Sequence, residues 1–262
     1  MSMLSFALRD TVSLLRRDLQ HSLRNVSFVF VLIVPTIMLL LFNYVFGGTI
    51  GAGLGRVAHG VAYINYLAPG ILIVAVGSGC AATALNLCMD MSEGVITRFR
   101  TMAIFRPSVL IGQAVGSLIR TLIGVVLVLG VALLVGFRPT TNPIAWIAAL
   151  GLIALVTLGI TWMGTLFGLV GKTPSGANSL AQLFILLTFI SSAYVSPDLM
   201  PVGVRWFAEY QPFTPDIDTL RGLLLGTPID AKSVVLAIAW SLGLTLFGYL
   251  GAQAIYNGNP AR

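Results

Sequence analysis

Charged residues are scarce in this sequence. They make up 9% of the chain, whereas 57% of it is hydrophobic, and a soluble domain has about 25% charged residues. This balance excludes an ordinary soluble domain and predicts an integral membrane protein, whose 262 residues form a single membrane domain over 1–262. The net charge of +6 requires no nucleic acid, because basic residues collect in cytoplasmic loops and meet anionic lipid.

Residues that carry chemistry are also few. The two histidines, His21 and His59, lie outside the long hydrophobic stretches and the motif HExxH is absent, which excludes a histidine-based metal cluster or intramembrane hydrolase. The two cysteines, Cys80 and Cys88, lie on one predicted helix about 12 Å apart, too far for a disulfide. We therefore predict no catalytic or metal site in this chain.

Acidic residues are missing from the interior of the hydrophobic stretches. Ion-coupled carriers usually place an ionisable relay there, so a proton-driven carrier is disfavoured. A membrane enzyme acting on lipids is disfavoured for the same reason, because general acid–base chemistry needs clustered carboxylates or histidines. Gly171-Lys172-Thr173 resembles the end of a phosphate-binding loop, but Leu166 stands where that loop needs glycine.

Six hydrophobic stretches are long enough to cross a membrane of about 30 Å as helices. They are Ser27–Phe46, Tyr63–Met89, Val109–Gly136, Ile144–Val170, Ala177–Val195 and Ser233–Tyr256. The sequence therefore predicts an all-α membrane protein with six spans. Pro35 lies in the middle of the first span and is expected to kink it.

The segment 1–26 is amphipathic, with leucines at helical spacing on one side and four arginines on the other. This pattern is typical of a helix lying in the membrane interface; the alternative is an unstructured basic tail. With the N-terminus inside, nine lysines and arginines fall in cytoplasmic segments and five in external ones. The distribution predicts that both termini are cytoplasmic.

The segment 196–232 has two hydrophobic patches, Val204–Tyr210 and Leu220–Leu225, that are too short to span. We interpret them as short re-entrant helices that enter the outer leaflet before the sixth span, with Trp206 and Tyr210 at the interface. The alternative is an ordinary exposed loop.

The third span carries Gly112, Gly116, Arg120 and Gly124 at intervals of four residues. These residues form one stripe of a helix, and small residues at this spacing favour close helix packing. Arg120 would then face protein or a watery cavity, as part of the transport path or of the seam between subunits. The alternative is an arginine that reaches toward the membrane surface.

The loop 90–107 is the one long polar insertion between two hydrophobic stretches on the predicted cytoplasmic side. Glu93 favours the start of a short helix, on which Val95, Phe99 and Met102 share one side. Such a helix can bind in a cleft of a soluble partner. The residues alone leave a second interpretation open, a solvated loop that only enforces orientation.

Several motifs in order resemble ABC-2 type permeases, and among them the daunorubicin-resistance branch of actinobacteria. They are Glu93-Gly94, Arg98-Phe99-Arg100, Leu110-Ile111-Gly112-Gln113, Gly136-Phe137, Ser191-Ser192-Ala193-Tyr194-Val195, Gln211-Pro212-Phe213-Thr214-Pro215 and Leu220-Arg221-Gly222-Leu223-Leu224-Leu225-Gly226. The sequence departs from the family pattern at Ala103, where the family commonly has proline.

The resemblance implies the membrane subunit of an ABC exporter, which is not itself an enzyme. It implies that Glu93, Gly94, Arg98, Phe99, Arg100 and Arg106 couple the chain to a separate ATPase subunit, which binds ATP and Mg²⁺, so that no cofactor is bound by this chain. A second permease subunit, identical or not, would complete the path. The implied substrate is a hydrophobic drug, antibiotic or lipid. A polysaccharide or lipid-linked glycan exporter, a non-ABC carrier and a membrane scaffold are the alternatives.

Overall fold

The computed structural model describes residues 26–48, 63–92 and 106–258. Over these residues the chain is helical, without a strand. The α-helices are α2 (Val26–Tyr44), α4 (Tyr63–Ser92), α6 (Arg106–Val135), α7 (Pro143–Val170), α8 (Pro174–Leu186), α9 (Val202–Tyr210), α10 (Phe213–Leu225) and α11 (Ala231–Gly258), with short 3₁₀ turns η1 (Leu187–Ile190) and η2 (Pro197–Leu199). The all-α fold is therefore confirmed.

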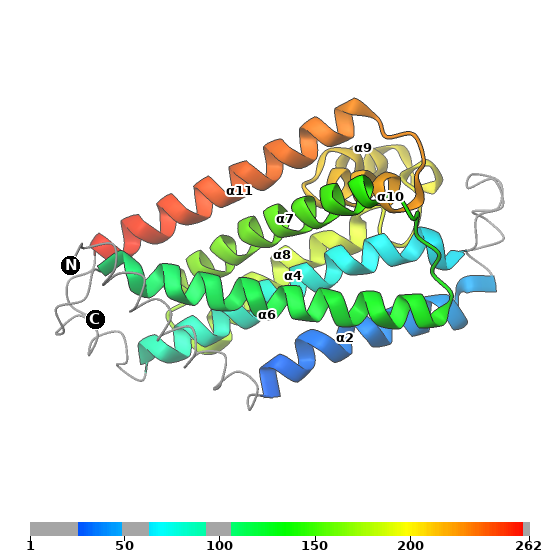
Figure 1. Ribbon diagram of the computed structural model, residues 1–262. Helices are drawn as coiled ribbons and strands as arrows, with labels where there is room; N and C mark the ends of the chain where they lie inside the picture. The colour runs from blue at the N-terminus through cyan, green and yellow to red at the C-terminus, as the bar shows by residue number, and fades with distance from the viewer. Residues whose placement is uncertain (1–25, 49–62, 93–105, 259–262) are drawn as a thin grey trace.

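The long helices lie side by side in one bundle, and the short helices α9 and α10 gather at the end where α6 leads into α7 (Figure 1). α4 lies at the centre, because it packs against α2, α6, α7 and α8. Among the described residues, four helices (α4, α6, α7 and α11) are long and apolar enough to cross a membrane, and two shorter apolar stretches lie at Ile33–Tyr44 in α2 and Pro174–Ile190 in α8–η1. The structure thus supports a multi-pass membrane protein, and the count of six spans stays a prediction.

Gly164 and Gly168 lie on α7 where this helix approaches α4 closely. A Cβ at Gly164 would lie 2.7 Å from the Cys80 carbonyl oxygen, and one at Gly168 would lie 2.8 Å from that of Ala84. Only glycine lets the two backbones come this near, as expected for small residues between membrane helices. Cys80 and Cys88 are both buried and free.

The fifth predicted span, Ala177–Val195, is wrong at its end. The helix tightens into η1 and stops at Ile190, and the chain then turns. Side-chain hydroxyls replace the helical hydrogen bonds here: the Ser192 N–H donates to Thr214 Oγ1 at 3.2 Å, and the Ala193 N–H donates to Ser191 Oγ at 3.2 Å. A side chain that satisfies a backbone group in this way competes with helix formation.

Both short hydrophobic patches of the segment 196–232 are helical, and α9 is largely exposed whereas α10 is largely buried. The second helix, α10, is longer than predicted and begins at Phe213 rather than at Leu220. Proline lacks the N–H that a helix interior needs but is tolerated in the first turn, which is where Pro215 lies. Whether either helix enters the membrane stays a prediction.

Candidate functional site

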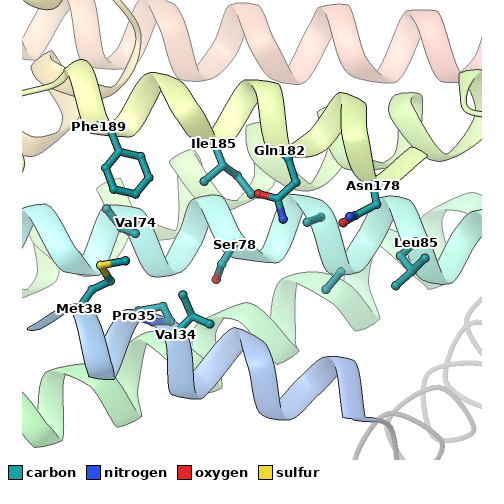
Figure 2. A pocket seen from close by; sticks show the side chains of 12 residues that line it. Val34, Pro35, Met38, Val74, Ser78, Leu85, Asn178, Gln182, Ile185 and Phe189 are labelled. Atoms are coloured by element: carbon teal, nitrogen blue, oxygen red, sulfur yellow. The ribbon is translucent and has the colours of Figure 1, made fainter. Parts of the chain in front are cut away.

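A groove of about 370 Å³ opens between α2, α4 and the α8–η1 segment. Small-molecule sites in proteins have volumes of about 300–1,000 Å³, so one small ligand fits. The residues that line the groove are Val34, Pro35, Met38, Val74, Ser78, Ala81, Ala82, Leu85, Asn178, Gln182, Ile185 and Phe189. Figure 2 shows their side chains from the three walls facing a common space.

The groove runs along the bundle from its middle toward the end at which α8 begins, because Asn178 is only four residues from Pro174. Ser78 is 15 residues from the start of α4 at Tyr63, which is about 22 Å along a helix. None of the lining residues carries a charge, and the polar ones are Ser78, Asn178 and Gln182. The surface is thus apolar with a few hydrogen-bonding groups, the usual character of a site for a hydrophobic ligand.

Aromatic rings close the groove toward the α9–α10 end. Phe189 lines the groove and stacks on Tyr194, with ring centroids 5.5 Å apart. Phe42 lies on the other side of Tyr194, at 4.4 Å between centroids. Tyr63 anchors this ring indirectly, because its hydroxyl donates to the Tyr194 carbonyl at 3.3 Å. A ligand in the groove therefore meets packed aromatic rings at this end.

Beyond the rings lies a polar group of residues that we call the Arg221 cluster: Tyr66, Ser192, Thr214, Asp218 and Arg221. Arg221 Nη1 donates to Asp218 Oδ1 and its Nη2 donates to the Ser192 carbonyl, both at 2.7 Å. Its Nε donates to the Tyr66 carbonyl at 3.2 Å, and the guanidinium lies 3.8 Å from the centre of the Tyr66 ring.

Ser192 hydrogen-bonds to several members of the Arg221 cluster. Its hydroxyl donates to Asp218 Oδ1 at 2.7 Å, and its carbonyl also accepts from the Tyr66 hydroxyl at 3.0 Å. The cluster joins α4, the turn after η1 and α10. Three of the motifs that carry the family resemblance (191–195, 211–215 and 220–226) thus meet at one place, which the sequence alone does not show.

The other residues singled out near this cluster have distinct surroundings. Trp206 is 68% exposed and Tyr210 is 40% exposed on α9, consistent with a position at a membrane interface. Pro212 precedes α10 and Pro215 lies in its first turn. A Cβ at Gly222 would lie 2.5 Å from the Ile229 side chain, so glycine is needed where the chain folds back toward α11.

The stripe Gly112, Gly116, Arg120 and Gly124 on α6 is buried within this single chain. Next to it, Ser117 hydrogen-bonds to Thr83 of α4. None of the four stripe residues lines the groove. Burial fits a stripe that faces protein; a role in the transport path or the subunit seam stays a prediction.

The predicted coupling residues Glu93, Gly94, Arg98, Phe99 and Arg100 lie outside the described residues. So do the segment 1–25, which holds nearly all of the predicted interfacial helix, and both histidines. Arg106 begins α6. The two helices flanking this loop are described: α4 ends at Ser92, and Gln113 Nε2 of α6 donates to Asp90 Oδ2 at 3.1 Å just inside that end.

Sequence reasoning did not single out Asp216, which lies in the segment 196–232. Its side chain is 2% exposed in α10, and its carboxylate accepts from the Ser241 hydroxyl of α11 at 3.5 Å. Burial raises the pKa of Asp216 well above the usual range of an aspartate. Sequence reasoning also missed the groove amides of Asn178 and Gln182, whose signal was two amides four residues apart, on one face of α8.

The family model described as ABC-2 type transporter matches residues 9–225. A relative named daunorubicin resistance ABC transporter permease protein DrrB1, from Streptomyces coeruleorubidus, is 25% identical over 88% of this chain and 77% of its own length. A relative named probable doxorubicin resistance ABC transporter permease protein DrrC, from Mycobacterium tuberculosis, is 22% identical over 81% of this chain and 75% of its own length.

Proposed function

We propose, because this chain belongs to the ABC-2 type transporter family, that it is the membrane-spanning permease subunit of an ABC exporter. It moves a hydrophobic or amphiphilic substrate, a drug, antibiotic or lipid, out of the cell. A separate ATPase subunit binds ATP and Mg²⁺ and supplies the energy. The observation that carries this proposal is the match of the family model to residues 9–225, which include the first five of the six predicted spans.

The groove supports the proposed substrate class. Its walls come from three helices, and its lining is apolar apart from Ser78, Asn178 and Gln182. Apolar surface removed from water by a matching ligand favours binding in proportion to its area. A strongly charged solute would lose its hydration here without gaining a counter-charge.

The rims of the groove support a second permease subunit. On α2, Ile33 and Ile37 are 46% and 53% exposed, and on α8, Leu183 and Leu186 are 66% and 56% exposed. A second subunit that packs on both faces would cover the open side of the groove and enclose the path between the two chains. Both termini face the cytoplasm in this proposal, as the distribution of lysine and arginine predicts.

Energy would reach the groove through α4. The loop 93–105 joins the end of α4 to the start of α6, and α4 contributes five of the lining residues, from Val74 to Leu85. ATP binding that moves this loop would therefore displace one wall of the groove directly. Glu93, Arg98 and Arg100 would transmit the displacement, and a nucleotide shifts the equilibrium only by its differential affinity for the two states.

Co-purification tests the proposal. The tagged chain is expressed in its own host and extracted in several mild detergents, and the accompanying proteins are identified. We expect an ATPase subunit with the wild type, its loss when Arg98→Glu and Arg100→Glu are combined, and its retention in the control Arg205→Glu at the other end of the bundle. The absence of any ATPase subunit with the wild type would contradict the proposal.

A transport assay tests the coupling role separately. Glu93→Ala and Arg98→Ala are expected to lower export while the protein still inserts in the membrane, because each removes a side chain that transmits the displacement and leaves the spans intact. Wild-type export by both variants would show that the loop does not couple.

A further inference from the structure

Two amides project into the groove from one side of α8. Asn178 and Gln182 are four residues apart, so they share one face of the helix. Figure 2 shows both side chains pointing from α8 into the space beside α4, where Ser78 lies. The groove thus has a polar strip on one wall in a lining that is otherwise almost wholly apolar.

The hydrogen bonds of these three residues differ. The Ser78 hydroxyl already donates to the Ala75 carbonyl at 2.7 Å, so it can only accept from a ligand. Among the residues that the structure describes, no group hydrogen-bonds to the amide of Asn178 or of Gln182. Each amide therefore offers two N–H donors and one carbonyl acceptor to whatever occupies the groove.

Asn178 is half-buried and Gln182 is exposed at the open side of the groove, so a ligand that fills the groove would remove both amides from solvent. An amide left without a hydrogen bond in an apolar environment is costly, so such a ligand must supply groups that pair with them. Hydroxyl and carbonyl groups match the amides as donors and acceptors. A cation does not match them as well, because no lining residue supplies a negative charge.

The apolar part of the groove completes the description of the ligand. Phe189 and Met38 face the same space from α8–η1 and α2 (Figure 2). An aromatic ring and a polarizable thioether are good partners for a flat ring system or an alkyl chain. A ligand that fills the groove would lay its apolar part against these two side chains and direct its polar groups toward α8.

We propose that Asn178 and Gln182 determine specificity in this groove, and that it takes an uncharged amphiphile with hydroxyl and carbonyl groups beside a flat or extended apolar part. The inference deepens the proposed function by naming the substrate class. On this proposal, the groove selects ligands by their formal charge rather than by their size.

A matched pair of fluorescent probes tests the inference. Daunorubicin carries a protonated amine, and N-acetyldaunorubicin keeps the same rings but is uncharged. Binding of each is measured by fluorescence quenching on the full chain in lipid nanodiscs. We expect the wild type to bind the uncharged probe at least tenfold more tightly than the cationic one.

The variants Asn178→Leu and Gln182→Met remove the amides while keeping similar volume. Each is expected to weaken binding of the uncharged probe about fivefold, the effect of one neutral hydrogen bond, and to leave the cationic probe nearly unchanged. The control Leu246→Ala, on an exposed face of α11 away from the groove, is expected to bind as the wild type does. Two amide positions are tested so that one misfolded variant does not decide the result.

Three results would overturn the inference: wild-type affinity for the uncharged probe in both amide variants, preference of the wild type for the cationic probe, or no binding of either. The proposed function has its own test, since capture of the ATPase subunit involves no groove residue. If the ATPase subunit co-purifies and the probes fail, only the assignment of the groove falls.

Discussion

Replacing Arg221 with glutamine should destabilise the junction of α4, α10 and the turn after η1. The substitution removes three hydrogen bonds, at 2.7, 2.7 and 3.2 Å, and the contact of the guanidinium with the Tyr66 ring. A hydrogen bond that involves a charged group contributes about 1.5–3 kcal/mol, so the simple sum for three is about 4.5–9 kcal/mol. That sum is too large, for two reasons.

The first reason is exposure. The Asp218 side chain is 36% exposed, so solvent screens its ion pair with Arg221 and lowers the contribution of that pair. The second is redundancy, since the Ser192 carbonyl keeps the hydrogen bond from the Tyr66 hydroxyl. We therefore expect Arg221→Gln to lower the free energy of unfolding by about 3 kcal/mol. Arg221→Lys should recover only part of this loss, because an ammonium cannot make the forked contacts.

The assay is unfolding of the purified chain in mixed micelles by a titration with SDS, followed by circular dichroism. Arg205→Gln is the matched control, because Arg205 also pairs with two acids, Asp198 and Glu209, both at 2.7 Å, but on an exposed surface. We expect the control to unfold almost as the wild type does. Equal losses in Arg221→Gln and Arg205→Gln would refute the argument that burial and the helix junction give Arg221 its importance.

Two further changes test other parts of the bundle. The raised pKa of Asp216 means that the folded chain holds a proton that the unfolded chain releases, so the free energy of unfolding should fall as pH rises above about 3.9, by at most about 1.4 kcal/mol per pH unit. Asp216→Asn can still bond to Ser241 and should abolish this pH dependence in melting curves. A variant as pH-dependent as the wild type would contradict the prediction. Gly164→Val should lower the free energy of unfolding by about 3 kcal/mol or prevent folding, because the new side chain would meet the Cys80 carbonyl. The control Gly151→Val has open space around it and should fold normally. Equal melting temperatures of the two variants would contradict the close approach of α7 to α4.

The long helices could be predicted from the sequence because each depends on a local property. The starts predicted at Tyr63, Val109, Ile144 and Ser233 lie within three residues of those of α4, α6, α7 and α11. A run of apolar residues longer than a membrane is thick leaves few alternatives to a helix. The same property cannot give the order of packing, since lipid-facing and protein-facing positions are equally apolar in such helices.

The end of α8 and the start of α10 could not be predicted, because each depends on the other. The turn after Ile190 is held by the contact of Ser192 with Thr214, residues 22 positions apart in the sequence. Read locally, Ser191 and Ser192 continue an apolar helix, and Pro215 and Asp216 belong to a loop. The contact between Ser192 and Thr214 makes both local predictions wrong. It satisfies a backbone N–H of the turn, and α10 is buried against α4, α7 and α11.

Polar residues of this chain therefore divide by whether their hydrogen bonds are complete, which composition cannot show. Ser192, Thr214 and Arg221 are paired with one another or with backbone groups, so they hold helices together and have little left for a ligand. Asn178 and Gln182 face a groove, and no described group pairs with them. In an apolar environment an incomplete set of hydrogen bonds is costly unless a ligand or water completes it. We therefore expect the proposed ligand site at the groove amides rather than at the more conspicuous charges, and a variant screen limited to arginines would miss it.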